Sequence, residues 1–396
     1  MTHYADREIN VDFIDALTTF IERVVRPVET RYAAELSTTG TIDPTAQLSE
    51  RRALRRQSAE LGYYSAHMPA ELGGFGLNAA TIAAAYRAIG RSGLLLADRG
   101  GVLPNVEGPY LSMAAFNDAQ REQYLSPLMR AEIEGCFALT EPDSGSDAGN
   151  MRTKATLEQD TWTISGTKRF ITHGAHADFV QVIAVTDPDA APSQRHSAFI
   201  VDSGTPGLSV GGTYGTLGED HPVDLVFEDV RVPTSAMIGE RGRALPYMLS
   251  GIGRARLNIG ALAIGKAEYL LSRMTDYAGE REAFGRPISK FQYVQQFIVD
   301  SSIEIEAGLG LMDRAAECAE SDDHTARRLT ASVKLYATEM LSRVADRAIQ
   351  LHGGMGVTHE GGVERYYRDA RAMRVYEGST ELLKWNIARW LGLKTD

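Results

Sequence analysis

The sequence predicts an α+β protein in which a helical region, a β region and a second helical region follow one another along the chain. Apolar side chains recur at three- and four-residue steps from Phe13 to Val24, which is typical of a helix that Pro27 ends or bends. Between about 135 and 235 the apolar runs are short and are bounded by Gly, Pro and Asp. Beyond Leu245, long periodic segments return. We therefore expect three domains, at 1–134, 135–235 and 236–396.

The first region is expected to contain further helices at 81–89 and 118–129, with Gly and Pro clustered between the helices. Residues 74–79 read Gly-Phe-Gly-Leu-Asn-Ala, which fits a loose dinucleotide-binding pattern. The preceding residues contain Pro69 and no β-branched strand, so the strand-turn-helix context of such a site is missing. We therefore predict no Rossmann site here.

The second region alternates in strand fashion. Residues 161–164 predict a strand that meets a turn at Ser165-Gly166 before a further strand at 169–171. More strands are expected at 179–185, 197–201 and 223–232, and long helices at 259–280, 293–320 and 325–351. The length of these last helices indicates a helical bundle.

Composition limits the classes of function. The chain has 396 residues, 43% of them hydrophobic, and a formal net charge of −11, which argues against a nucleic-acid surface. Only Cys136 and Cys318 occur, and neither H-E-x-x-H nor C-x-x-C is present, so we expect no disulfide scaffold and no metal. Residues 1–10 lack the apolar segment of a signal peptide, and no apolar run approaches a membrane span. A soluble, cytoplasmic protein is expected.

Five blocks of sequence carry the functional prediction: Phe137–Asp147, Arg169–Gly174, Arg281–Ile288 with Gln292, Gln350–Gly356, and Arg374–Glu381. In this order and at this spacing, together with Pro69–Gly74, they resemble the acyl-CoA dehydrogenases. One block alone is moderately specific, whereas all five span nearly the whole chain. The resemblance implies an N-terminal helical domain, a middle β-barrel-like domain and a C-terminal four-helix bundle.

The resemblance also implies FAD as the cofactor, an acyl-CoA substrate and an electron-transfer flavoprotein as the electron acceptor. It implies a homotetramer, built as a dimer of dimers; the composition already argues against a nucleic-acid partner and a membrane. The residues it assigns to FAD are Phe137, Leu139, Thr140, Ser146, Phe170, Thr172, Arg281, Phe284, Gln292, Gln350, Gly353, Gly354, Ser379 and Glu381.

Within this set the implied roles differ. Phe170 would lie against the flavin ring, Thr172 would donate its hydroxyl toward flavin N5, and Ser146 would bind phosphate oxygens. Arg281 would meet the FAD pyrophosphate, for which a guanidinium is well shaped. By resemblance, Arg281, Phe284, Gln292 and the Gln350–Gly354 segment serve the site of a neighbouring subunit.

Glu377 is the implied catalytic base, which removes the α-proton of the thioester while FAD accepts the β-hydride. Ser146, Arg256, Tyr376 and Gly378 are the implied substrate contacts. Burial in an apolar pocket should raise the pKa of Glu377 and strengthen it as a base.

Three positions of the sequence bear on this assignment. Some family members carry the base near the position of Ala255, where alanine cannot serve. Gly253 stands where better-known members often have an acidic residue that contacts CoA. Asn150 replaces the small residue that usually closes the first signature block of the family.

Plainer interpretations stand beside these. Glu377 alone could be an exposed loop acid, Arg281 a charge on a helix face, Gly353-Gly354 a helix C-cap, and Phe170 a core residue of the β region. The charges from Arg368 to Arg374 most simply form a solvated or interface run. For the whole protein, the alternatives are a flavin oxidase or monooxygenase on the same fold, or a non-catalytic assembly subunit.

Overall fold

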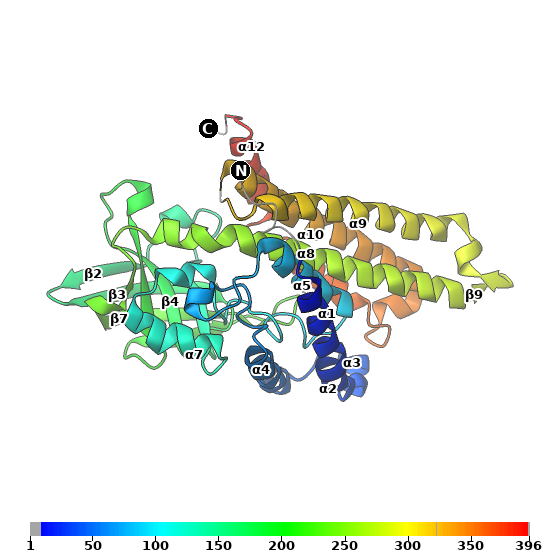
Figure 1. Ribbon diagram of the computed structural model, residues 1–396, viewed down its shortest axis with the longest axis horizontal. Coiled ribbons are helices and arrows are strands. Elements are labelled where there is room, and N and C mark those ends of the chain that lie inside the picture. Colours follow the sequence, from blue (N-terminus) through cyan, green and yellow to red (C-terminus); the bar gives the residue numbers. More distant parts are fainter. Residues whose placement is uncertain (1–8, 322, 395–396) are drawn as a thin grey trace. The chain divides into compact units, whose positions relative to one another are not determined.

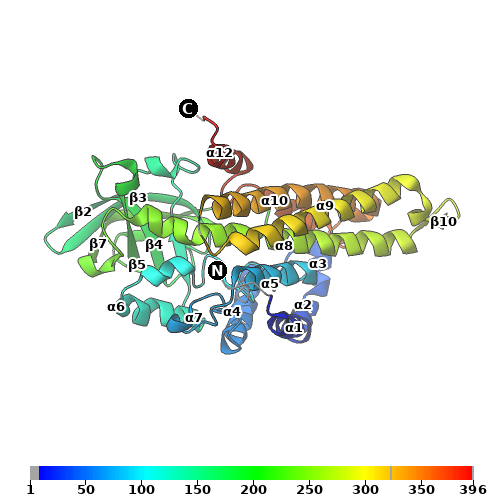
Figure 2. The ribbon, with the colours of Figure 1, turned by 45° about the horizontal axis from the view of Figure 1, so that its top comes forward.

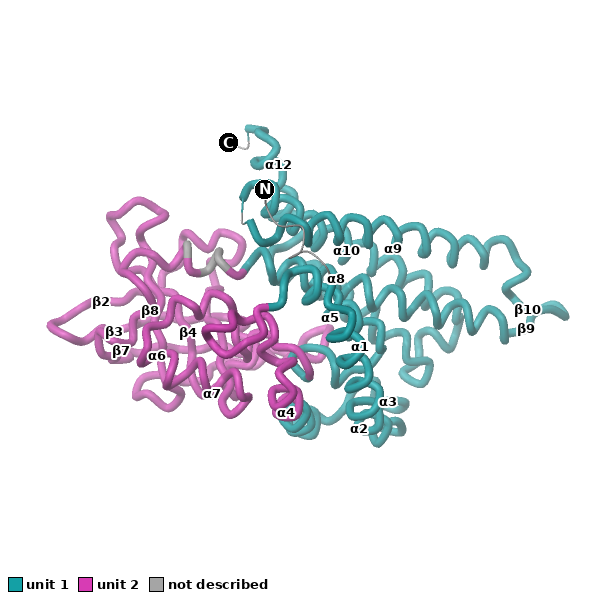
Figure 3. Tube along the Cα trace, in the orientation of Figure 1, with its two compact units in different colours: residues 1–54, 77–101, 252–396 teal, residues 55–76, 102–251 magenta. Residues whose placement is uncertain are grey.

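The computed structural model describes residues 9–321 and 323–394. The chain forms two compact units, coloured in Figure 3: unit 1 comprises residues 1–54, 77–101 and 252–396, and unit 2 comprises residues 55–76 and 102–251. Residues of the predicted N-terminal domain are distributed over both units. Most of the N-terminal segment in which we expect no signal peptide lies outside the described residues.

The first helical segment continues through Pro27 instead of ending there. Asn10 caps its start by accepting a hydrogen bond from the Phe13 backbone N–H at 3.0 Å. A π-helical segment precedes Pro27, which lies in the first turn of the next helix, where its missing N–H costs little. The helices and turns of this part are α1 (Val11–Phe20), η2 (Ile21–Val25), α2 (Arg26–Thr30), α3 (Ala33–Thr39), α4 (Pro44–Glu60) and α5 (Ala79–Ser92).

In the C-terminal part of unit 1, three long helices lie side by side in Figures 1 and 2. They are α8 (Ala244–Glu280), which starts in unit 2, α9 (Gln292–Cys318) and α10 (His324–His352); the shorter helices α11 (Glu364–Met373) and α12 (Thr380–Trp390) follow. A short hairpin of β9 (Glu282–Ala283) and β10 (Arg286–Pro287) joins α8 to α9 at the end of that pair. The α8 helix starts well before the predicted residue 259, because Gly251 and Gly253 weaken the helical signal of its first turns.

Unit 2 is built on an eight-stranded sheet. Seven strands follow the order β6-β7-β3-β2-β4-β5-β8, and β1 pairs in parallel with β4. The strands are β1 (Gly135–Ala138), β2 (Lys154–Glu158), β3 (Thr161–Ile171), β4 (Phe179–Val185), β5 (His196–Asp202), β6 (Leu208–Thr213), β7 (Val223–Pro233) and β8 (Met237–Ile238). Smaller helical elements of this unit are α6 (Asp118–Gln120), η5 (Arg121–Leu125) and α7 (Ser126–Met129).

Both faces of β4 are covered. Phe179 and Ile183 belong to one apolar cluster, which also contains Phe116 from the helical segment before the sheet. Val180 and Val182 alternate with them and belong to a second cluster, within the sheet. A strand buried on both faces reads as a continuous apolar run, and the sequence predicted this strand with the bounds that are observed.

The predicted turn at Ser165-Gly166 is wrong. Strand β3 runs through both residues and pairs with β7 on either side, with a register shift between Ile164 and Gly166. Gly166 has φ +152°, and a Cβ there would lie 2.5 Å from Thr153 Oγ1. Gly166 therefore allows a β-bulge and the close approach of Thr153, and it does not form a turn.

The predicted order of helices, β region and helices is confirmed. The Gly-Phe-Gly segment follows a short 3₁₀ turn at Ala70–Leu72, and Asn78 caps α5. Cys136 and Cys318 are both unpaired. Among the described helices, none has both the length and the apolar character that crossing a bilayer requires.

Candidate active site

The loop between α11 and α12 carries Glu377 in an unusual backbone conformation. Glu377 has φ +54° and Gly378 has φ +96°, so two successive residues are left-handed. For a residue with a Cβ this conformation costs roughly 1–2 kcal/mol, which surrounding contacts must offset.

Two cationic side chains hold the two carbonyl groups of this loop. Arg256 on α8 donates from Nε to the Glu377 carbonyl at 3.4 Å, and Lys334 on α10 donates from Nζ to the Gly378 carbonyl at 2.7 Å. Arg256 is 7% exposed and Lys334 is fully buried. The left-handed pair is therefore fixed from two helices at once.

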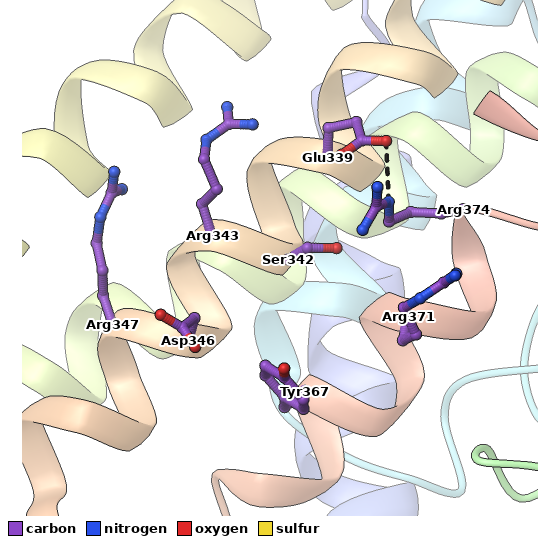
Figure 4. Close-up of a pocket in the computed structure, with 8 residues that line it drawn as sticks. All are labelled: Glu339, Ser342, Arg343, Asp346, Arg347, Tyr367, Arg371 and Arg374. Carbon is purple, nitrogen blue, oxygen red and sulfur yellow. Dashed lines mark hydrogen bonds and ion pairs between the residues drawn. The ribbon is translucent and has the colours of Figure 1, made fainter. Parts of the chain in front are cut away.

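A carboxylate on α10 ties the two ends of the same loop together. Glu339 Oε1 accepts hydrogen bonds from Arg374 Nε at 2.9 Å and from the Thr380 hydroxyl at 2.7 Å, and Figure 4 shows the first of these. The Thr380 N–H also donates to the Arg374 carbonyl at 3.1 Å. The loop that carries Glu377 is thus closed between Arg374 and Thr380, the first residue of α12.

Electrostatics at Glu377 reflect opposing effects. Burial raises the pKa of the Glu377 carboxyl, as the sequence analysis expects, and the positive charges of Arg256 and Lys334 act against this rise. Burial lowers the pKa of Lys334 to about 8, while Glu377 acts to raise it. Glu377 is half-buried and not an exposed loop acid. A carboxylate in this state is a stronger base than one in water.

The α8 segment near Arg256 contains no second carboxylate at the alternative position, which is Ala255. Gly253, two residues earlier, has space around it. A Cβ at Gly253 would have Thr330 Oγ1 as its nearest neighbour, at 3.7 Å. Crowding by the described residues therefore does not account for the glycine.

A cavity of about 400 Å³ lies between α10 and α11, and Glu339 is one of the residues that line it (Figure 4). Its lining is mostly charged: Glu339, Ser342, Arg343, Asp346, Arg347, Tyr367, Arg371 and Arg374. Arg343 and Arg347 both pair with Glu304 of α9. A lining of this kind differs from the largely apolar wall that an acyl chain requires.

Of the solvated or interface charge run predicted at 368–374, the solvated alternative is wrong for Asp369. This carboxylate is buried and forms ion pairs with Lys266 and Arg99. Helix α8 supplies the lysine, and a sequence pattern along α11 alone does not reveal that neighbour.

Unit 2 supplies the residues that the resemblance assigns to the flavin ring. Phe170 is 54% exposed, with φ +57°, and packs edge-on against Tyr214 with 4.8 Å between ring centroids. Asp224 accepts a hydrogen bond from the Tyr214 hydroxyl at 2.9 Å and pairs with Arg169. Phe170 is therefore a supported surface aromatic and not the core residue of the plainer interpretation.

The first signature block is held against β3 by a buried lysine. Lys168 donates from Nζ to the Leu139 carbonyl at 2.9 Å and to Glu141 at 2.8 Å, and burial lowers the pKa of Lys168 to about 8. The Arg169 N–H donates to the Thr140 carbonyl at 2.8 Å. These bonds place Leu139 and Thr140 beside β3, which carries Phe170 and ends one residue before Thr172.

The remaining predicted groups of unit 2 are accessible. Thr172 and Phe137 are half-buried, and the Thr172 hydroxyl has no hydrogen-bond partner among residues 9–321 and 323–394. Ser146 is exposed in the turn that follows Ser144, whose hydroxyl donates to the Asp147 carbonyl at 2.6 Å. Hydroxyl groups left free in this way can bind a ligand.

A second group of predicted FAD residues lies at the opposite end of the long helices of unit 1. Arg281, Phe284, Gln292, Gln350, Gly353 and Gly354 are all exposed, and Phe284 is 96% exposed. Tyr277, one turn before Arg281, stacks on His352 with 4.4 Å between ring centroids, so the hairpin and the end of α10 lie together. Gly353 is also the C-cap of α10, as the plainer interpretation expects.

Glu377 is far from this group within the chain. Arg256, beside Glu377, and Glu280 are 24 residues apart on α8, which corresponds to about 36 Å. One chain therefore does not bring Arg281 and Glu377 into one site. The other predicted residues near Glu377 are Tyr376, which is 38% exposed, Ser379, whose hydroxyl oxygen caps α12 at 3.3 Å from the Leu382 nitrogen, and the exposed Glu381.

The sequence analysis missed Lys334, Glu339 and the Tyr214–Asp224 support of Phe170. A signal existed for Lys334, which is a single basic residue within the apolar run of α10 around it. No comparable signal marks Tyr214, because Phe170, the ring it packs against, lies on β3, far from it in sequence.

Comparison with known proteins finds matches along almost the entire chain. Residues 9–132 match the family model described as acyl-CoA dehydrogenase, N-terminal domain. Residues 136–230 match the middle domain, and residues 242–392 match the C-terminal domain, of the same family.

Individual relatives agree with this. The chain is 35% identical to (R)-benzylsuccinyl-CoA dehydrogenase of Thauera aromatica over 340 residues, covering 85% of this chain and 84% of that protein. It is also 35% identical to the mitochondrial short-chain specific acyl-CoA dehydrogenase of Mus musculus, covering 87% and 82% of the two chains. Among solved structures, a glutaryl-CoA dehydrogenase from Mycobacterium smegmatis in complex with FADH2 superposes with a TM-score of 0.83 at 25% identity, covering 100% and 96%.

Proposed function

The chain belongs to the acyl-CoA dehydrogenase family, and from this premise we propose that it converts an acyl-CoA thioester to the trans-2-enoyl-CoA, with Glu377 as the α-proton acceptor. The observation that carries the proposal is the state of Glu377. It is a half-buried carboxylate with a raised pKa, on a left-handed loop that two cations hold.

The local chemistry suits removal of a weakly acidic proton. A carboxylate whose pKa is raised by burial accepts a proton more readily than an ordinary glutamate, yet the charges of Arg256 and Lys334 favour the ionised form that must act. The Glu377 backbone N–H donates to no acceptor in the described part of the chain. This donor would stabilise the developing charge on the thioester oxygen.

We propose FAD as the cofactor, because the residues present fit it. Phe170 offers an exposed aromatic face, Thr172 an uncommitted hydroxyl, and Ser146 an exposed hydroxyl for a phosphate oxygen. Phe137, Leu139 and Thr140 would bind the polar edge of the flavin through their backbone. When bound, FAD supplies the acceptor for the hydride that leaves the β-carbon.

Assembly into a homo-oligomer is part of the proposal. Arg281 and Phe284 would serve the FAD of a neighbouring subunit, since they lie at the opposite end of α8 from Arg256. Exposed apolar side chains support a contact surface on α9, where Tyr293 is 83% and Ile303 is 64% exposed. We propose a tetramer as the complete assembly.

We propose an electron-transfer flavoprotein as the electron acceptor, because the family resemblance implies it. The cytoplasm is the proposed location, which agrees with unpaired thiols at Cys136 and Cys318.

The test is an anaerobic titration of the purified flavoprotein with acyl-CoA thioesters, followed by loss of flavin absorbance. The panel includes short straight-chain, branched and aryl-substituted acyl groups, because the relatives named above differ in this respect. Reduction by one class identifies the substrate group. Failure of every thioester to reduce bound FAD would contradict the proposal, and rapid reoxidation by oxygen would favour an oxidase.

The Glu377→Gln variant tests the assignment of the base. It keeps the size of the side chain and should bind thioester, but we expect its reduction rate to fall by about 10²–10⁴-fold, which is the usual contribution of a general base. A near-normal rate would show that another group removes the proton.

A further inference from the structure

Two buried lysines of unit 1 differ in what their ammonium groups meet. Lys266 forms ion pairs with Asp98 and Asp369, so its charge is compensated directly. Lys334 is fully buried and makes its hydrogen bond to the Gly378 carbonyl at 2.7 Å. Burying an ammonium against a neutral acceptor is costly, and the pKa of Lys334 falls accordingly to about 8.

The hydrogen bond from Lys334 lies where it can hold the loop that carries Glu377, which gives the costly burial of this ammonium a structural role. The Gly378 carbonyl belongs to the second of the two left-handed residues, and Arg256 already holds the carbonyl of the first, Glu377. Lys334 and Arg256 come from different helices, so the peptide unit between the two carbonyls is fixed from both sides.

We propose that Lys334 is a positioning residue for Glu377: its ammonium holds the Gly378 carbonyl and thereby keeps the Glu377 carboxylate in its working orientation and ionised. This rests on the proposed function, in which Glu377 is the base. Without Lys334, the left-handed pair would lose one of its two anchors. A misplacement of about 1 Å at a reacting group can reduce a rate about 10²-fold.

The positive charge of Lys334, like its hydrogen bond to the Gly378 carbonyl, favours a working, ionised Glu377. The charged groups that influence Lys334 are Glu377, Arg256 from α8, Glu339 on α10 itself, and Glu381 from α12. Since the ammonium of Lys334 lowers the pKa of Glu377, removing it leaves the effect of burial less opposed. The pKa of Glu377 should therefore rise, and its ionised form should persist only at higher pH.

The experiment compares the FAD-loaded wild-type protein with three variants. Lys334→Met removes the ammonium and keeps the apolar stem, whereas Lys334→Arg keeps a cation and N–H donors as the conservative rescue. Thr338→Val is the packing control, because Thr338 is also fully buried on α10, one turn along, and its hydroxyl bonds only helix carbonyls. Lys334→Gln serves if the Met variant does not fold.

We expect Lys334→Met to reduce the rate of flavin reduction about 10²-fold, with KM for the thioester nearly unchanged. Its rate-against-pH curve should shift toward higher pH. Lys334→Arg should restore the wild-type curve at least in part, and Thr338→Val should match wild type. A wild-type curve in Lys334→Met, or equal losses in Lys334→Met and Thr338→Val, would overturn the proposal.

A measurement without substrate keeps this test separate from the proposed function. The infrared carboxyl band of Glu377, identified by its absence in Glu377→Gln, is followed against pH in wild type and in Lys334→Met. We expect it to titrate at higher pH in the variant, and an unchanged titration would count against the role of Lys334. If no thioester reduces the wild type, the proposed function fails, while this titration still decides the role of Lys334.

Discussion

Complementation between two inactive variants would test whether each FAD site needs two chains. Arg256, beside Glu377, lies about 36 Å along α8 from Glu280, which immediately precedes Arg281. If Arg281 serves the neighbouring subunit, a chain with Glu377→Gln and a chain with Arg281→Glu damage different sites. In a hybrid dimer, one site carries both lesions and the other carries neither.

The magnitude follows from two-fold symmetry. Random mixing of equal amounts makes about half of the dimers hybrid, and each hybrid has one intact site of two, so about a quarter of wild-type activity should return. The assay measures flavin reduction by thioester in the unseparated mixture of coexpressed, differently tagged chains; hybrids isolated through both tags should reach about half of wild-type activity. Each homomeric variant is the control, and both should be nearly inactive.

The result that would refute the reasoning is equally definite. If Arg281 served its own chain, both sites of a hybrid would carry one lesion and no activity would return. Hybrids that assemble normally but show no activity above the homomers would therefore exclude the two-chain site. Full wild-type activity in the Arg281→Glu homomer would exclude any role for Arg281 in FAD binding.

Three further predictions follow from the geometry. Because burial raises the pKa of Glu377, its inactive protonated form persists to higher pH than for an ordinary glutamate, so the reduction rate should climb with pH through that raised pKa; a rate already at its plateau near pH 5 would contradict this. Gly253→Asp should change unfolding free energy by no more than about 0.5 kcal/mol, since its nearest neighbour is 3.7 Å away, but should alter KM for the thioester more than kcat; an unchanged KM would separate this position from substrate binding. Lys266→Met should lower the free energy of unfolding by about 3–5 kcal/mol in urea titration, because Asp98 and Asp369 lose the ammonium between them, and a loss under 1 kcal/mol would show that other groups compensate.

Much of the fold was predictable because its signals are local. The apolar run at β4 and the periodicity of α9 and α10 are properties of contiguous residues, and both were placed within a few positions of the observed bounds. Gly166 shows where locality fails. A serine-glycine pair between strands favours a turn, yet the residue that approaches Gly166 closely is Thr153, which directly precedes the adjacent strand β2.

The candidate site likewise contains residues that the local sequence predicted and residues that depend on neighbours distant in sequence. Glu377 was identified from its sequence block and its raised pKa was expected, whereas the left-handed backbone is visible only in the structure. Lys334 was not identified, because its partner is a backbone carbonyl 44 residues away and a carbonyl has no signature in sequence. Asp369 was misjudged for a related reason, since Lys266 lies 103 residues away on another helix.

The arrangement along α8 separates two requirements of the proposed reaction. The orientation of Glu377 is set within one chain, because Arg256 and Lys334 both belong to the unit that carries the loop. Retention of FAD, by contrast, would depend on Arg281 of a neighbour, at the other end of the same helix. Dilution that dissociates the assembly should therefore release the cofactor while the Glu377 loop stays intact. Loss of FAD and misplacement of Glu377 are therefore separate defects. A substitution on the exposed surface of α9 that weakens the assembly should cause loss of FAD and leave the Glu377 loop unchanged.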